Sequence, residues 1–450
     1  MGLARGAVQV HLYLGVWAGY FVLLVLLPVR YGALQEFLAA GSLILWVGLS
    51  ALAAYATSAL FGRRQFSLSA AAQSARRPLD SRDLNRIVLI GLGMGAVGFV
   101  ALAFDRIVIQ GVDFTQGIAV ARQLWQQGGE EREGVSSVFS VIGYLVGFGF
   151  FVSTTFAHLH WERLTKRMRL VVIIGASFLV VANSFLAGGR SVVLIQLACI
   201  VATGGLRALL GLRMFPGRSS RTLLGIALTS ILAMSYAIYV FSERAEAGGT
   251  MPERYAHEML RYLGGEPTEQ FFSLGDLPFF TASTAQFGTV AGAYLTHSFG
   301  TFESVLEIRA TPGDVSFGFI RELLVKLGVV DAASDEWILG GRFLSLPGSL
   351  WYDFGWLGFY LGALVLGCLL GSVPAIVAIV GGGGLSVCAA LVLLITGLLA
   401  PLLLAIDIMC VPFLITGFVI VDTAHRMWFG PTSWFFVGRP VRDARFEMFS

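Results

Sequence analysis

The stretch GSLWYDFGWLGFYLGALVLGCLLG, residues 348–371, decides the fold class. It opens with small polar residues and one acidic side chain, Asp353, and then continues without a charge to residue 371. A helix needs roughly 20 apolar residues to cross about 30 Å of lipid hydrocarbon. The stretch therefore predicts a helix that enters a membrane directly after Asp353.

Runs of this kind recur along the chain. Of its 450 residues, 56% are hydrophobic and 13% are charged, and the mean hydropathy is +0.77. This composition is far more apolar than that of a soluble globular protein. We therefore predict an all-α polytopic integral membrane protein with ten spans. They cover residues 10–29, 36–61, 87–112, 136–157, 170–188, 192–212, 222–242, 354–380, 385–400 and 402–424.

The first span and the cysteines each have a second interpretation. Arg5 precedes an apolar run, as in a signal peptide, but no small-x-small cleavage site follows the run and the next span begins directly. We expect the first helix to remain in the protein. The cysteines Cys199, Cys368, Cys388 and Cys410 lie inside predicted spans, so neither a disulfide framework nor a metal or cofactor site is indicated.

The basic residues are divided unequally between the loops, and this predicts the orientation. Cytoplasmic loops of membrane proteins carry an excess of Lys and Arg. The loop over 62–86 holds six arginines, and the loops after the fourth and sixth spans and the C-terminal tail are also basic. We predict that these segments and both termini face the cytoplasm.

The spans divide the chain into four parts. These are helices one to seven (1–242), a large loop on the outer side (243–353), helices eight to ten (354–424) and a cytoplasmic tail (425–450). The outer loop holds fifteen Asp and Glu against seven Lys and Arg, whereas the whole chain has a net charge of +3. Within it, 251–263 is predicted as an amphipathic helix, and 287–307 as a helix able to dip into the membrane but too polar to cross it.

Common enzyme motifs are missing from the sequence. It has no Walker-type loop, HExxH, paired CxxC or GxSxG. An Asp-x-Asp pair is also missing from the predicted outer side, which argues against a divalent metal that holds a diphosphate. An anionic substrate on this side must therefore be held by arginine.

Three arginines on the predicted outer side are candidates for binding phosphate. Arg190 lies in the turn between spans five and six, Arg244 lies where span seven ends, and Arg342 lies where the large loop returns to the membrane. A guanidinium group pairs bidentately with phosphate oxygens. The alternatives are a snorkelling or orienting charge for Arg190 and a salt bridge within the loop for Arg342.

Other outer charges have weaker claims. For Arg122 in the shorter outer loop, and for Arg254 and Arg261 on the amphipathic helix, a solvated face is the favoured interpretation. Asp105 and Arg106 stand together near the outer end of span three. Because an adjacent pair near the interface costs less than a lone charge at mid-bilayer, structural and functional roles are equally open for them.

The candidate catalytic residues are His297, Asp407 and Asp353, with Glu243 as a further outer carboxylate. A histidine suits proton abstraction from a hydroxyl, although a lone histidine is more often structural. Asp407 is the one charge between residues 385 and 421, and a carboxylate inside a span either indicates function or joins helices. Asp353 is equally suited to capping the helix that follows it.

Two motifs carry a resemblance to a known family. LAGGRSVVLIQL (186–197), followed by the large loop and LPGSLWYDFGWLGFYLGALVLGCLLG (346–371), resembles the bacterial O-antigen or oligosaccharide repeat-unit polymerases of the Wzy type. In that family a Gly-Arg-Ser step between two spans and an Asp-Phe-Gly entry to a late span recur. These steps map onto Arg190 and Asp353.

The resemblance implies a GT-C-like glycosyltransferase of the bacterial inner membrane, akin in architecture to O-antigen ligases. The implied substrate is an oligosaccharide on undecaprenyl diphosphate, handled on the periplasmic side without a metal. A hydroxyl of one lipid-linked unit attacks the anomeric carbon of the growing chain, and undecaprenyl diphosphate leaves. The implied partners are membrane lipid and a chain-length-regulating co-polymerase, and no nucleic acid.

Rival functions stay open on the sequence alone. An O-antigen ligase or another polyprenyl-phosphate glycosyltransferase uses the same kind of donor. A transporter of lipid-linked glycans predicts inverted repeats, interrupted helices and polar residues at mid-bilayer, whereas polar residues here concentrate at the outer rim. A non-catalytic membrane scaffold is the third alternative.

Overall fold

The computed structural model describes most of the chain. The described residues are 7–63, 81–130, 136–187, 191–216, 235, 238–246, 248–273, 282–306, 313, 315–318, 320, 324, 329, 344–379, 384–405 and 410–429. Within them the regular secondary structure is helical, apart from one pair of two-residue strands.

The elements follow one another in chain order. Up to residue 209 they are α2 (Val8–Leu26), β1 (Val29–Arg30), α3 (Ala33–Arg63), α5 (Ser81–Phe104), the π-helix η1 (Asp105–Ile109), the 3-10 helix η2 (Phe114–Gln116), α6 (Ile118–Glu130), α7 (Val138–Val146), α8 (Gly149–Leu159), the 3-10 helix η3 (Trp161–Arg163), α9 (Lys166–Ala187) and α10 (Ser191–Leu209). After it come α12 (Pro252–Tyr262), β2 (Glu266–Pro267), α13 (Glu269–Ser273), α14 (Ala282–Val305), α16 (Leu346–Ile379), α17 (Gly384–Leu399) and α18 (Cys410–Phe429).

The apolar helices confirm a multi-pass membrane protein. Eight helical segments of the described residues are long and apolar enough to cross a membrane: Val8–Leu26, Glu36–Phe61, Ser81–Ile109, Val138–Leu159, Lys166–Leu186, Ser191–Leu209, Leu346–Val377 and Cys410–Phe429. The apolar helix α17 is shorter. In contrast, α14 has 24 residues but is not among the eight, as expected for a helix too polar to cross. Most of the predicted span over 222–242 lies outside the described residues.

Two predicted helix starts differ from the structure. The span expected from residue 354 belongs to α16, which already begins at Leu346. Gly355 interrupts α16 with a φ of 61° and a ψ of −157°, a conformation that glycine adopts without strain. The predicted span therefore corresponds to the piece after Gly355. The span expected from residue 402 corresponds in the described residues to α18, which begins at Cys410, and residues 401–405 form turns and irregular chain.

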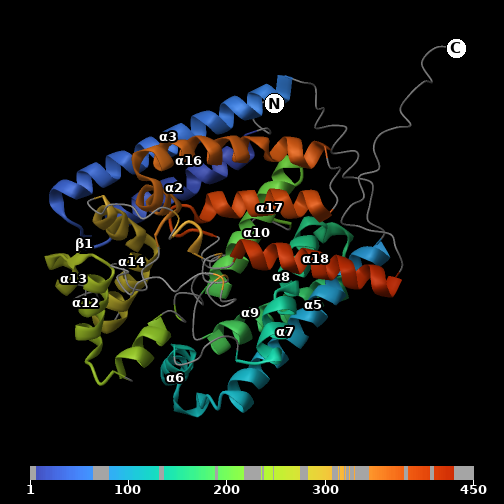
Figure 1. Cartoon of the computed structure of the whole chain (residues 1–450), viewed down its shortest axis with the longest axis horizontal. Coiled ribbons are helices and arrows are strands. Elements are labelled where there is room, and N and C mark those ends of the chain that lie inside the picture. The colour runs from blue at the N-terminus through green and yellow to red at the C-terminus, as the bar shows by residue number, and fades with distance from the viewer. Residues whose placement is uncertain are drawn as a thin grey trace.

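The helices form two hydrophobic cores. One core unites α5, α7, α8, α9, α10, α17 and α18, and the other unites α2, α3, α12, α13, α14 and most of α16. Figure 1 shows α2, α3 and α16 along one flank, and β1, α12, α13 and α14 gathered at one end of the molecule, away from the C-terminus. The end that carries α14 is therefore built on the second core.

Glycines explain the close pairing of α3 with α16. A Cβ added to Gly367 would lie 2.3 Å from the carbonyl oxygen of Ser50, and one added to Gly371 would lie 2.5 Å from that of Ala54. Small residues four positions apart allow two membrane helices to approach closely. The glycines of the stretch at 348–371 thus hold α16 against α3.

Candidate functional site

The strand pair joins the predicted outer loop to the turn between α2 and α3. Val29 lies opposite Pro267 and Arg30 opposite Glu266, and the N–H of Thr268 donates to the carbonyl of Pro28 at 3.0 Å. We call β1, β2, α12, α13 and α14, together with residues 238–246, 344–355 and 400–405, the α14 assembly. Figure 1 shows β1, α12, α13 and α14 of this assembly close together at one end of the molecule.

A network of hydroxyl groups attaches α14 to α2 and to the 400–405 segment. The Tyr20 hydroxyl lies 2.9 Å from Ser298 Oγ, and Ser298 Oγ donates to the carbonyl of Pro401 at 2.5 Å. The Tyr31 hydroxyl lies 3.4 Å from Thr296 Oγ1. Burial raises the pKa of Tyr31, and nearby carboxylates add to this effect against the opposing Thr296 hydrogen bond. The phenol therefore stays protonated as a donor.

The carboxylate of Glu303 binds the start of α3. The backbone N–H of Gly32 donates to Glu303 Oε2 at 3.1 Å, and Glu303 is buried. A carboxylate at a helix N-terminus satisfies an orphan donor and complements the helix dipole. Glu303 was not singled out from the sequence, because only the fold brings α14 beside residue 32.

His297 lies on the buried part of α14 with its tautomer fixed. Its Nδ1 is 2.6 Å from the carbonyl oxygen of Tyr294. A carbonyl can only accept, so Nδ1 carries the proton, and in the neutral ring Nε2 holds the lone pair. The side chain is 4% exposed. The geometry is that of a histidine able to accept a proton at Nε2.

Asp353 lies just before the interruption of α16 at Gly355. Its carboxylate accepts the backbone N–H of Val315 at 3.1 Å and that of Ser316 at 2.5 Å, and the residue is 1% exposed. The two bonds therefore go to the large loop and not to the first turn of its own helix, which was the alternative role considered from the sequence. At the start of α16, Ser345 Oγ instead accepts the N–H of Gly348.

The 400–405 segment connects the α14 assembly to the last helix. Leu346 donates its N–H to the carbonyl of Ala400 at 3.0 Å, and Leu404 donates to the carbonyl of Leu344 at 3.1 Å. The chain before α16 and the chain before α18 are thus paired. With the bond from Ser298 to Pro401, this segment contacts both α14 and the start of α16.

Arg244 belongs to a helical stretch, 238–246, that packs on α14. The ring centroid of Phe241 lies 6.0 Å from that of Phe287 and 5.6 Å from that of Tyr294. Residues three apart share one side of a helix, so Arg244 lies on the side that faces α14, and it is only partly exposed. The neighbouring Glu243 points to the turn before α6 instead, since a Cβ added to Gly117 would lie 2.8 Å from its Oε2.

Three candidates cannot be placed. Arg190, Arg342 and Asp407 lie outside the described residues. Of the site residues predicted from the sequence, the structure places His297, Asp353 and Arg244 in the α14 assembly.

The remaining outer arginines differ in their surroundings. Arg254 pairs with Glu258 at 2.8 Å and Arg261 with Glu266 at 3.8 Å, and all four side chains are more than half exposed. These contacts fit the solvated face expected for α12. Arg122 lies on α6 and is partly exposed.

Asp105 and Arg106 are buried in separate networks. Asp105 accepts hydrogen bonds from Gln110 and from the hydroxyls of Ser136 and Ser137. Arg106 donates to the carbonyl of Leu186 and to the Tyr144 hydroxyl, and its guanidinium lies 4.2 Å over the ring of Trp125. Both residues are at most 3% exposed. Of the two interpretations, this geometry favours the structural one.

Arg207, near the end of α10, is fully buried. It donates to the carbonyls of Arg213, His158 and Leu159 at 2.8 Å and to the carboxylate of Glu162. We call this arginine with its partners the Arg207 junction, and it ties the end of α8 to the turn after α10. Its role could not be read from the sequence, because the carbonyl partners carry no residue-type signal.

Two further findings concern metal binding and the relatives of the chain. Within the described residues, no group of three His, Cys, Asp or Glu is placed to hold a metal ion. Comparisons with protein-family models, curated proteins and solved structures find no match to this chain.

Proposed function

We propose that the chain is a glycosyltransferase that polymerises oligosaccharide repeat units carried on undecaprenyl diphosphate at the periplasmic face of the bacterial inner membrane. The observation that carries the proposal is the α14 assembly, which gathers a tautomer-fixed histidine and the Arg244 helix at one end of an apolar bundle. A lipid-linked substrate presents its diphosphate at such an end while its prenyl tail stays in the bilayer.

The reaction exchanges one bond at the anomeric carbon. The acceptor hydroxyl oxygen forms a new C–O bond there, the bond to the diphosphate oxygen breaks, and the diphosphate takes the electron pair. The hydroxyl proton passes to a base. The leaving group is stabilised by preorganised positive charge as its own charge develops.

We assign the base to His297 Nε2, with Asp407 as the alternative. The hydrogen bond from Nδ1 to Tyr294 orients the ring and leaves Nε2 as the acceptor. Because His297 is buried, the proposal requires the assembly to open beside α14 when the acceptor enters.

We assign diphosphate binding to Arg244, Arg190 and Arg342, and a positioning role to Asp353. The partial exposure of Arg244 on the α14 side supports its part. Asp353 holds residues 315 and 316 of the large loop through two backbone bonds, so it would act on the site through the loop.

The test is polymer formation in membranes supplied with lipid-linked repeat units. Arg244→Ala should shorten the ladder of repeat lengths and lower the rate roughly a hundredfold, whereas Arg254→Ala on the exposed face of α12 should leave both unchanged. Transfer of single glycans to a lipid A core in place of a ladder would indicate an O-antigen ligase. Equal ladders from both variants would remove the proposal for Arg244.

A further inference from the structure

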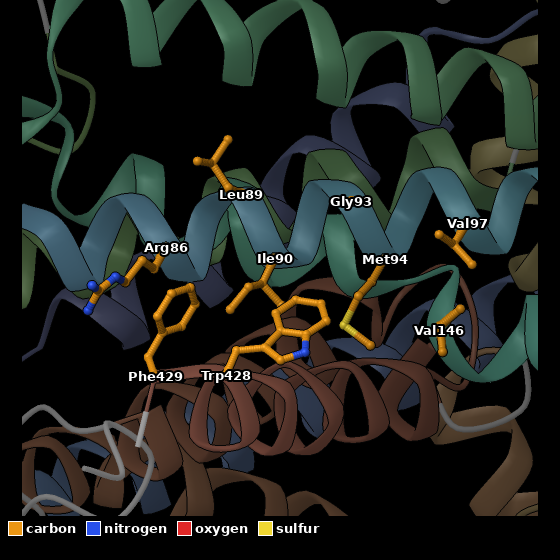
Figure 2. Close-up of a pocket in the computed structure, with 9 residues that line it drawn as sticks. All are labelled: Arg86, Leu89, Ile90, Gly93, Met94, Val97, Val146, Trp428 and Phe429. Atoms are coloured by element: carbon orange, nitrogen blue, oxygen red, sulfur yellow. The ribbon is translucent and has the colours of Figure 1, made fainter. Parts of the chain in front are cut away.

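An apolar groove lies between α5 and the end of α18. Its volume is about 430 Å³, and Arg86, Gly93, Val97, Val146, Trp428 and Phe429 are among its lining residues. Figure 2 shows Arg86 and Phe429 at one end, Trp428 along the side and Val97 and Val146 at the other end. The groove has no part in the α14 assembly.

The length of the groove matches one leaflet of a bilayer. Arg86 and Val97 are eleven residues apart on α5, which corresponds to about 16 Å at a rise of roughly 1.5 Å per residue. Half of the hydrocarbon core of a bilayer is about 15 Å. Because α5 spans the membrane, the groove runs from one interface to about the middle.

The interface end of the groove carries cationic and aromatic groups. The Arg86 guanidinium lies 4.2 Å over the ring of Phe429 and pairs through Nη1 with Asp83 at 3.0 Å, while its side chain stays 41% exposed. Trp428 is 66% exposed, and tryptophan favours the headgroup level. Arg82 lies one turn earlier and is exposed. These groups favour a phosphate headgroup.

We propose that this groove binds one anionic phospholipid of the leaflet at this end of the molecule. An acyl chain lies along α5 from Ile90 to Val97, and the headgroup phosphate accepts hydrogen bonds from Arg86. Two arginines near the mouth against one partly exposed aspartate favour a lipid with net negative charge over a zwitterionic one. The inference is independent of the proposed function.

The test is lipid retention by the full chain, purified in mild detergent from membranes and analysed by native mass spectrometry. The chain should retain one phosphatidylglycerol in preference to phosphatidylethanolamine. Gly93→Phe should reduce retention on the order of tenfold, because its ring occupies the groove and each lost buried methylene costs about 0.8 kcal/mol. A Cβ at Gly93 meets nothing within 4 Å, so the variant should fold.

The matched control is Gly48→Phe on α3, which is also exposed and also without a neighbour within 4 Å of a Cβ. It should retain the lipid fully. Arg86→Gln should lower the preference for the anionic lipid about fivefold, the equivalent of about 1 kcal/mol per arginine at the membrane surface. Equal retention in Gly93→Phe and Gly48→Phe, no preference between headgroups, or a prenyl phosphate as the retained lipid would each overturn the proposal.

Discussion

The Arg207 junction and the α14 assembly both bury polar groups, but they satisfy them in different ways. Arg207 is completely buried, and its guanidinium is taken up by three carbonyls and one carboxylate. In the α14 assembly, the hydroxyls of Tyr20 and Ser298 and the carboxylates of Glu303 and Asp353 join segments far apart in the chain through one or two hydrogen bonds each.

This difference in hydrogen bonding indicates that the Arg207 junction is structural and that the α14 assembly is the candidate site. A guanidinium that is saturated by main-chain acceptors has little capacity left for a ligand. Breaking one or two hydrogen bonds costs less free energy than breaking all the bonds of a buried guanidinium. The Arg207 junction should therefore govern stability, and the α14 assembly should govern substrate handling.

The largest expected effect comes from Arg207. Arg207→Ala leaves three carbonyls and the Glu162 carboxylate without their donor, and should lower the free energy of unfolding by about 3 kcal/mol or more. Thermal unfolding in detergent measures it. Arg207→Lys should recover only part of this loss, because an ammonium cannot reproduce the planar fork. Arg254→Gln, in an exposed pair, should change stability by less than about 1 kcal/mol. An unchanged melting temperature for Arg207→Ala contradicts the structural role.

The second effect is a pH dependence at the same junction. Burial, followed by the charges of Arg163 and Arg207, lowers the pKa of His160 from 6.5 to about 4. Between these values the unfolded chain binds the proton more readily than the folded chain, so stability should fall as the pH falls from 6.5 to 4, by at most about 1.4 kcal/mol per pH unit. His160→Phe should flatten the melting temperature over this window. A parallel pH profile for both proteins would show that His160 is not responsible.

The third effect concerns the carboxylate of Asp353. Asp353→Asn keeps the shape of the side chain but weakens two hydrogen bonds to the loop, and should cost about 2 kcal/mol. Hydrogen exchange at the amides of Val315 and Ser316 should rise in this variant. Asp113→Asn, at an exposed turn, is the control. Protection of the two amides equal to that in the parent protein would remove the anchoring role.

The smallest effect is that of one hydroxyl in the α14 assembly. Tyr20→Phe removes the hydroxyl beside Ser298 and should cost about 1 kcal/mol. Tyr360→Phe is the control, because its hydroxyl makes no hydrogen bond within the described residues. If the two variants melt at the same temperature, the hydroxyl network does not hold α14 in place.

The membrane class could be predicted because it depends on composition and run length alone. The break at the Tyr-Asp-Phe-Gly step was also readable, since Gly355 follows a polar step before a continuous apolar run. The start of α16 at Leu346 was not, because residues 346–354 mix apolar side chains with Pro347, Gly348, Ser349 and Asp353, a composition that suits a loop as well as a helix. The tertiary contact at Gly367 and Gly371 needs α3 as a partner, which no local pattern names.

The site was predictable only in part. His297 and Asp353 were singled out by residue type, and the structure supplies the partners, Tyr294 and residues 315 and 316, that define what each can do. The roles of Glu303 and Arg207 were not predicted, because they bind backbone groups distant in the sequence. Every residue carries such backbone groups, so neither composition nor spacing indicates which of them a side chain will bind.

The proposed function requires that the α14 assembly faces the periplasm. In a chain whose four cysteines are replaced by alanine, Met251→Cys places one thiol at a position 75% exposed at the start of α12, and Thr165→Cys places one at the exposed turn before α9. A membrane-impermeant maleimide applied to intact spheroplasts should label Cys at position 251 and should reach position 165 only after lysis. Labelling of position 165 alone in intact spheroplasts would place the α14 assembly inside the cell, where no periplasmic glycan could reach it.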